Sequence, residues 1–204
     1  MALVYNATLT PTKRDLLNAW LPSRPWFPAH AKVAKLRAYR FDDPAGSVGL
    51  ESFVLDVADG VVVHIPLTYR DAPLAGADDF LVGTADHSVL GKRWVYDGCG
   101  DPVWVAALAT AILTGGNEAE VLMEDGDTVV RLDSRVRVHG SGTGDAPIAV
   151  PDAVKCEDDG PTTIAHAGGL TLVTVRLVGT EISATDTLVA QWGDGHEAVV
   201  AGTT

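Results

Sequence analysis

The chain has 204 residues, 47% of them hydrophobic and 21% charged, so it is long enough to bury a sizeable core. Its formal net charge of −12 argues against a nucleic-acid-binding protein, which presents a dominant basic surface. The sequence has no signal-peptide pattern, no apolar run near the ~20 residues of a membrane helix and no cysteine framework, so we expect a cytoplasmic protein.

The N-terminal part predicts one helix followed by strands. Thr10-Pro11 reads as an N-cap and a first helical residue, and it opens a short helix with one apolar stripe. Pro22 and Pro25 end this helix, because proline has no amide hydrogen to donate. Strands are expected at about 34–41, 48–57 and 61–69. The last two flank Asp59-Gly60, a two-residue hairpin signal.

The third of these strands alternates between two faces. Val63 and Ile65 fall on one face, which we expect to be buried. His64 falls on the opposite face, where a partly exposed side chain is expected. Pro66 favours an edge position or a bulge, because it cannot donate to a neighbouring strand.

The rest of the chain predicts a second helix and then mostly strands. Short strands are expected at 80–83 and 94–96. Asp101-Pro102 caps a helix at about 102–113, which Gly115-Gly116 closes. Further strands are expected at 120–124, 128–138, 170–178, 188–192 and 197–201, with turns at Asp125-Gly126 and Asp194-Gly195. Residues 139–169 look like a long loop or linker. The fold class is α+β, with helices packed on a largely antiparallel sheet.

No catalytic or cofactor motif stands out, so no cofactor and no metal are expected. There is no H-E-x-x-H, G-x-S-x-G or Walker pattern, and the six histidines show no metal-ligand spacing. The run Gly140–Gly144 lacks the lysine and helix start of a phosphate cradle, which favours a flexible linker. Asp97 and Asp101 are best explained as a turn residue and an N-cap. Asp194–Glu197 is best explained as a solvated turn.

The stretch "WLPSRPWFPAHAK" at residues 20–32 gathers aromatic and cationic side chains. Tryptophan faces can serve as platforms for sugar rings and for cations. Trp20 and Trp104 lie on helical stripes, which favours the core. Trp26 lies in a proline-bounded loop, where a core position and a ligand platform are both open.

The stretch "WLPSRPWFPAHAKVAKLRAYRF" resembles the N-terminal cap of actinobacterial maltokinases, which carries an L-x-x-R-x-W-[FY] element followed by a basic residue and a strand. The matching residues are Leu21, Arg24, Trp26, Phe27, Lys32 and Lys35. A second stretch, "GKRWVYDGCGDPVWVAALATAIL", is similar to the family's V-Y-D-x-x-x-D-P segment. The resemblance covers about residues 8–116.

This resemblance implies a fold and a metabolic setting. The implied fold is a curved antiparallel sheet packed on a helix, a cystatin-like cap, at 1–116, followed by a β-rich C-terminal subdomain at 117–204. The setting is α-glucan, maltose or trehalose metabolism. Complete maltokinases transfer phosphate from ATP in a C-terminal lobe. Here no H-G-D-x-H-x-x-N/Q loop occurs, and the only lysine after Lys92 is Lys155. We therefore expect a free-standing, non-catalytic cap-like protein without the kinase lobe.

The charge pattern suggests where a partner binds. Residues 1–40 hold seven Lys and Arg side chains against the single acid Asp15, whereas the remainder is strongly acidic. This basic segment can dock on its own acidic body or on an acidic partner. Leu21, Trp26 and Phe27 are expected to pin the helix to the sheet. The candidate partner- or ligand-binding residues are Arg24, Trp26, Lys32, Lys35 and Arg37.

Three functions remain open from the sequence. The first is an accessory, protein-binding module whose partner is an enzyme of glucan or maltose metabolism. The second is a carbohydrate-binding module for maltooligosaccharides or glycogen, with Trp26 and Trp94 stacking on glucose units. The third is a glucan-active enzyme or a degenerate sugar kinase. Nucleic-acid and membrane partners are not expected.

Overall fold

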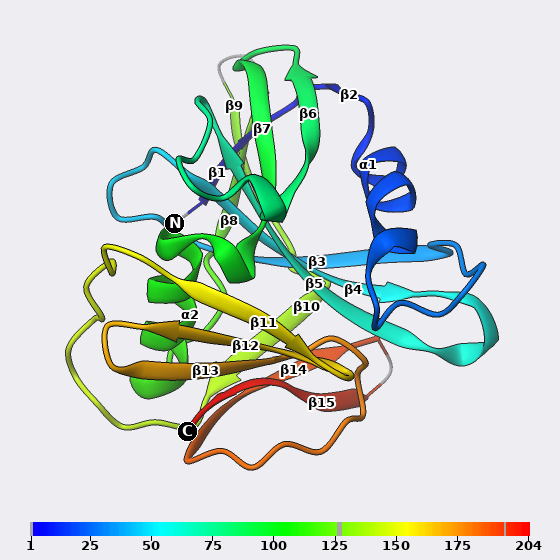
Figure 1. Cartoon of the computed structure of the whole chain (residues 1–204). Helices are drawn as coiled ribbons and strands as arrows, with labels where there is room; N and C mark the ends of the chain where they lie inside the picture. Colours follow the sequence, from blue (N-terminus) through cyan, green and yellow to red (C-terminus); the bar gives the residue numbers. More distant parts are fainter. Residues whose placement is uncertain (1, 126–127, 194) are drawn as a thin grey trace.

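The structure is a computed structural model that describes residues 2–125, 128–193 and 195–204. Its first sheet is antiparallel and has six strands in the order β2-β6-β7-β5-β4-β3. These strands are β2 (Leu9–Thr10), β3 (Lys35–Phe41), β4 (Gly49–Asp56), β5 (Val62–Arg70), β6 (Leu81–His87) and β7 (Gly91–Asp97). Helix α1 (Lys13–Trp20) and the short helix η1 (Leu21–Ser23) pack on one face of this sheet (Figure 1).

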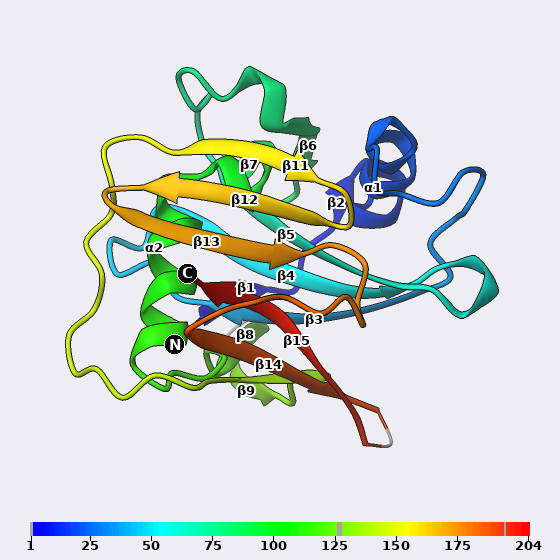
Figure 2. The same ribbon diagram turned by 60° about the horizontal axis from the view of Figure 1, so that its bottom comes forward.

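A second antiparallel sheet, with helix α2 (Pro102–Leu113), packs on the opposite face (Figure 1). Its order is β10-β14-β15-β13-β12-β11, and Figure 2 shows β11, β12, β13, β15 and β14 running side by side. The strands are β10 (Val136–Gly140), β11 (Lys155–Asp159), β12 (Thr162–Ala167), β13 (Leu170–Val175), β14 (Asp186–Trp192) and β15 (His196–Thr203).

A small third sheet joins the N-terminus to the middle of the chain. Strand β1 (Ala2–Tyr5) runs parallel to β8 (Val121–Asp125), which pairs antiparallel with β9 (Thr128–Leu132). Two further short helices, η2 (Ala58–Gly60) and η3 (Asp78–Phe80), lie in connections between strands, and a third, η4 (Gly98–Gly100), connects β7 to α2. The α+β class and the curved antiparallel sheet packed on a helix are thus confirmed.

Alternation along β4 explains the two cores. Phe53 and Leu55 point towards α1, whereas Leu50 and Val54 point towards α2 and the second sheet. The core on the α2 side combines residues from both sides of position 116. Tyr39 and Trp104 belong to it together with a set from the second sheet that includes Leu172, Leu188 and Val200. Residues 1–116 and residues 117–204 therefore both contribute to the core on the α2 side. A division into domains at residue 116 stays a prediction.

The first helix begins two residues later than the sequence predicts. Thr12 is its N-cap, because Asp15 lies three residues on and completes a capping box. The Thr12 hydroxyl accepts from the Asp15 amide at 3.2 Å, and the Asp15 carboxylate accepts from the Thr12 amide at the same distance. Thr10 belongs to β2 instead. For the second helix, the predicted bounds and the Asp101 cap are confirmed.

The structure agrees with some of the expected turns and loops and differs from others. The hairpin between β4 and β5 is present, but its loop contains η2 and not a two-residue turn, because the ladder ends at Asp56 and Val62. The expected turns at Asp125-Gly126 and Asp194-Gly195 include residues outside the described ones. The predicted strand at 128–138 is interrupted, since β9 ends at Leu132 and β10 begins at Val136.

The expected long loop at 139–169 is wrong in its second half. Strands β11 and β12 pair across the turn that contains Gly160, whose φ is +54°. The acidic sequence of β11 hides its strand character, because Asp and Glu have low β-propensity. The irregular part is limited to residues 141–154, between β10 and β11.

His64 is fully buried, which contradicts its expected exposure. Both faces of β5 are covered, because Val63 and Ile65 pack on the α1 side while the His64 ring lies against the second sheet and stacks on Tyr39 at 5.9 Å. The chain after β13 also pairs with one edge of β5. The His64 amide donates to the Arg176 carbonyl at 2.9 Å, and Val63 forms a β-bridge with Leu177. Pro66 lies between this bridge and Leu67, where pairing with β7 begins. Its missing donor therefore falls where β5 has no partner on that edge.

Candidate functional site

The five candidate residues of the basic segment follow α1 and continue into β3. Arg24 and Trp26 lie just after η1, Lys32 lies in the loop before β3, and Lys35 and Arg37 lie on β3 itself. The structure gives these side chains three different environments: one is buried, two are engaged with neighbours, and two are exposed.

Trp26 is the buried one, with only 5% of its surface exposed. Its ring meets Trp20 and Phe27 edge-on, with centroid distances of 6.0 and 6.4 Å. Its indole N–H donates to Asp158 Oδ1 at 3.2 Å, and the Arg176 guanidinium lies over its ring. No open face is left for a sugar ring. The structure therefore places Trp26 in the core, together with Leu21 and Phe27.

Arg24 and Arg37 are engaged within the chain. The Arg24 guanidinium stacks over Trp20, 5.1 Å from the ring centroid, and donates to the Ser23 hydroxyl. Arg37 donates through both terminal nitrogens to the two Asp56 oxygens, at 2.8 and 2.7 Å. This pairing lowers the pKa of Asp56. Arg37 is thus not free for a partner, contrary to expectation.

Lys32 and Lys35 are exposed and form no ion pair with the described residues. Lys35 lies at the start of β3, the edge strand of the first sheet. A lysine at this position also discourages a foreign strand from adding to the edge. These two lysines are the part of the predicted site that the structure leaves available to a partner.

Other cations of the basic segment dock on the acidic body, as one reading of the charge pattern predicts. Lys13 and Arg40 both bind Glu51, at 2.6 and 3.0 Å. Burial favours the neutral form of Glu51, but the charges of Arg40 and Lys13 outweigh it and lower its pKa to about 2. Tyr69 donates to the same carboxylate at 2.9 Å. This buried cluster is fully paired, as a stable buried carboxylate requires.

The two carboxylates considered for acid–base chemistry have structural partners. Asp101 caps α2, with the Val103 amide donating at 3.0 Å, and it also accepts from Arg70 and from the Thr68 hydroxyl. Asp97 accepts from the Cys99 amide at 3.2 Å and pairs with Arg176. The turn and N-cap roles expected for these residues are confirmed. Across the described residues, no group of three or more His, Cys, Asp or Glu side chains is arranged to hold a metal ion.

Arg176 is a buried cation that the sequence analysis did not identify. It is 1% exposed, and its terminal nitrogen lies 2.5 Å from Asp97 Oδ2. Its Nε donates to the Thr163 hydroxyl at 2.7 Å. The charge of Asp97 outweighs the effect of burial and raises the pKa of the guanidinium. An arginine directly after a strand of Val, Leu and Thr was the available signal, because a charge there requires a buried partner.

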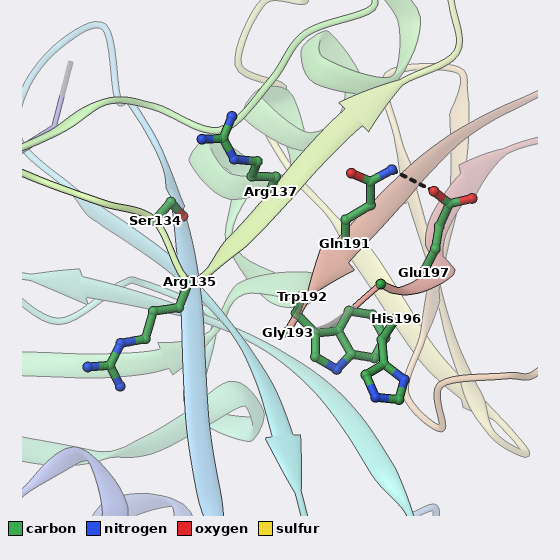
Figure 3. A pocket seen from close by; sticks show the side chains of 9 residues that line it. Ser134, Arg135, Arg137, Gln191, Trp192, Gly193, His196 and Glu197 are labelled. Carbon is green, nitrogen blue, oxygen red and sulfur yellow. Dashed lines mark hydrogen bonds between the residues drawn. The ribbon is translucent and has the colours of Figure 1, made fainter.

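An open hollow of about 410 Å³ lies where β10, β14 and β15 meet (Figure 3). Figure 3 shows Arg137, Gln191 and Glu197 in one row, as the strand register requires, and Gln191 donates to Glu197 at 2.5 Å. The Trp192 and His196 rings stack at 5.8 Å nearby. The sequence indicated only a solvated turn at 194–197. The hollow offers cationic, amide and acidic groups together, and this mixture selects no single ligand class.

Residues 20–101 match the family described as the maltokinase N-terminal cap domain. The resemblance to a maltokinase cap is confirmed. No curated protein matches the chain. Among the described residues, none of the helices is both long and apolar enough to cross a membrane.

The matched region, here called the cap region, contains η1, β3 to β7 and the N-cap of α2. All five candidate residues of the basic segment lie inside it. The hollow at β10, β14 and β15 lies outside it, as do Arg176 and Asp158, which hold Trp26 in place. The second sheet therefore buries a tryptophan that belongs to the cap motif.

Proposed function

We propose that this chain is a non-catalytic, accessory module that binds a cytoplasmic enzyme of α-glucan, maltose or trehalose metabolism. The match of residues 20–101 to the maltokinase cap family supports the metabolic setting. The observation that carries the binding role is the pair of exposed lysines in the cap region. Neither lysine forms a direct ion pair among the described residues; Lys35 lies opposite Asp56, whose carboxylate already holds Arg37 through two hydrogen bonds.

The environment of these lysines fits an acidic partner. Lys32 follows the proline-rich turn of residues 22–28 and lies beside the buried Ala31 and Val33, so its backbone is anchored while its side chain is exposed. Exposed charges steer the association of an oppositely charged partner at long range. The partner surface that fits is therefore acidic.

The other two readings have less support. A carbohydrate module built on Trp26 loses its platform, because that ring is covered by Arg176. Trp94 is half-buried and its ring is covered by Lys92, whose Nζ lies 4.7 Å from the centroid. An enzyme that uses Asp97 and Asp101 would have to break the ion pairs that hold these carboxylates.

A pull-down from native cytosol at low salt tests the proposal, with bound proteins identified by mass spectrometry. The wild-type chain should capture an enzyme acting on maltose, trehalose or α-glucan. The double variant Lys32→Glu/Lys35→Glu should capture much less, because its charge now repels an acidic surface. The matched control is Arg135→Glu/Lys155→Glu, which makes the same change of charge at exposed positions outside the cap region.

Two results would contradict the proposal. One is the absence of any specific partner at low salt, where steered contacts are strongest. The other is equal capture by both double variants, which would show that total charge and not this surface governs binding.

A further inference from the structure

The two cysteines of the chain lie against each other, although they are 57 positions apart in the sequence. Cys99 lies in η4, between β7 and α2, and Cys156 lies on β11. The Cys156 thiol donates to the Cys99 carbonyl oxygen at 2.7 Å. The side chain of one cysteine thus rests directly on the backbone of the other, a contact that their spacing in the sequence did not indicate.

The two thiols differ in their access to solvent. Cys99 is fully buried in the core on the α2 side, whereas Cys156 is half-buried and packs against that core. Strand β11 is the edge of the second sheet, and among the described residues it pairs with β12 alone. A dissolved oxidant therefore reaches Cys156, and Cys99 is reached through Cys156. This is the arrangement of an attacking thiol and a resolving thiol.

A covalent bond between the two cysteines is compatible with the fold. Disulfide-bonded cysteines have Cβ atoms about 3.5–4.5 Å apart. Since the Cys156 sulfur already touches the Cys99 peptide group, the bond requires rotation of the two side chains and no new contact between distant elements. An edge strand with one partner can also shift slightly towards η4 to complete the geometry.

We propose that Cys99 and Cys156 form a reversible disulfide by exchange with a small-molecule disulfide such as oxidised glutathione. The Cys156 thiolate attacks one glutathione sulfur, which forms a mixed disulfide and releases one reduced glutathione. The Cys99 thiolate then attacks the Cys156 sulfur and releases the second. Two protein thiols are oxidised, one glutathione disulfide is reduced, and the two thiol protons end on the two released glutathione molecules.

The surroundings of the pair make this exchange slow. Burial raises the pKa of both thiols, that of Cys156 to about 12. Asp97 and Asp158 add to this effect at Cys156, whereas the charge of Arg176 opposes it. Because the thiolate is the nucleophile, little of the reactive form is present at neutral pH. The pair therefore stays reduced during brief exposure and closes under sustained oxidation.

The disulfide would tie the cap region to the second sheet. Cys99 lies within the matched residues 20–101, and Cys156 lies two positions before Asp158, which accepts the indole bond of Trp26. Closing a loop of 57 residues restricts the unfolded chain, so the oxidised form should be the more stable one. This bond does not depend on the proposed function or on the Lys32–Lys35 surface.

Intact-mass spectrometry of the full chain tests the proposal, after incubation with excess oxidised glutathione and quenching in acid. The wild type should lose two hydrogen atoms and carry no glutathione. Cys99→Ala should stop with one glutathione on Cys156, because it lacks the thiol that displaces it. Cys156→Ala should keep its mass, since Cys99 is fully buried. Far-UV circular dichroism checks that both variants fold, and the mass of the wild type decides the proposal even where a variant does not.

Thermal denaturation measures what the bond does to the fold. The oxidised wild type should melt about 5–15 °C above the reduced one, and dithiothreitol should abolish the difference. A wild type that keeps both free thiols, or that stops at a glutathione adduct, would overturn the proposal. So would a disulfide that forms only between two chains, visible as a dimer on a non-reducing gel.

Discussion

The indole ring of Trp26 covers the guanidinium of Arg176, whose Cζ lies 4.9 Å from the ring centroid. The same guanidinium is paired with Asp97 on β7 and bonded to Thr163 on β12. Trp26 in turn donates to Asp158 on β11. One buried cation therefore joins the N-terminal loop, the first sheet and the second sheet.

Removing the Trp26 ring should lower the stability of the fold, because the ring is part of the core and not a ligand-binding platform. Trp26→Ala is expected to lower the free energy of unfolding by about 3–5 kcal/mol, as large-to-small changes in a core do. Trp26→Phe should cost less, because part of the ring stays over Arg176. Guanidinium chloride denaturation measures both, with Trp94→Phe as a control at a half-buried position. Wild-type stability in Trp26→Ala would show that this ring does not belong to the core.

Removing only the Asp97 charge from the Arg176–Asp97 pair should leave an uncompensated buried cation and lower the free energy of unfolding. Asp97→Asn leaves the buried guanidinium without its counter-charge, and a loss of about 3–5 kcal/mol is expected. The double variant Asp97→Asn/Arg176→Met removes the cation too, so its loss should be smaller than the sum of the two single losses. A double-mutant cycle of denaturation midpoints measures this coupling. Purely additive losses would contradict it.

The elements were predictable where local sequence decides them. Asp101-Pro102 specifies the start of α2, because the cap bond and the missing proline donor both act within a few residues. The strand pattern of β3 to β5 was readable for the same reason. Within the candidate site, Lys32 and Lys35 were correctly expected at the surface, since no hydrophobic periodicity requires their burial.

The environments of His64, Trp26 and Arg37 depend on segments far away in sequence. His64 is buried because the second sheet and Tyr39 pack on its face of β5. Trp26 is covered by Arg176, and Arg37 meets Asp56 only because β3 and β4 pair in one particular register. Alternation within a strand identifies two faces, but it does not say what packs on each. These contacts therefore required the structure.

Buried His64 should make the protein sensitive to mild acid. Burial, reinforced by the nearby charge of Arg176, lowers the pKa of His64 from 6.5 to about 3. Above pH 6.5 His64 is neutral in both states and this contribution is fully present. As pH falls from 6.5 towards 3, the unfolded state takes up a proton that the folded state refuses, so stability is lost at up to ~1.4 kcal/mol per pH unit.

Urea denaturation across this pH range measures the effect, and His64→Gln should flatten the profile between pH 6.5 and 4.5. Below pH 4.5 a second loss should remain in the variant. The pKa of Glu51 is held at about 2, so its stabilising contribution is lost as pH falls from 4.5 towards 2. A profile above pH 4.5 that is the same in both proteins would contradict the assignment to His64.

Charge reversal should destabilise the protein more at an ion-paired arginine than at the exposed lysines. Arg37→Glu loses the two-bonded pair with Asp56 and places like charges together, so a loss of about 1 kcal/mol is expected. Lys32→Glu/Lys35→Glu breaks no direct ion pair but places a glutamate at position 35 opposite Asp56, so the melting temperature should fall less than in Arg37→Glu, without unfolding the protein. Differential scanning fluorimetry compares the two. If the double reversal unfolds the protein, the lysines are structural and the proposed partner surface is wrong.

The glycine run Gly140–Gly144 was expected to be a flexible linker, but it closes the C-terminal end of α2. The Gly142 amide donates to the Ile112 carbonyl and the Gly144 amide to the Leu113 carbonyl, both at 2.8 Å. These bonds satisfy carbonyls that the last turn of a helix leaves without partners. A Cβ at Gly140 would lie 1.8 Å from the Ala111 carbonyl oxygen. At Gly142 a Cβ would lie 2.3 Å from the Leu113 oxygen, and at Gly144 it would lie 3.0 Å from that oxygen.

Alanine substitution at each glycine should therefore reveal a graded cost. Gly140→Ala and Gly142→Ala force backbone to move and should each lose about 1–3 kcal/mol of unfolding free energy. Gly144→Ala should lose less, because its neighbour has to shift by only a few tenths of an ångström. In a flexible linker the sign would be opposite, since replacing glycine by alanine restricts the unfolded chain and stabilises by about 0.4–1 kcal/mol. Equilibrium denaturation of the three variants decides between a helix cap and a linker by the sign of the change.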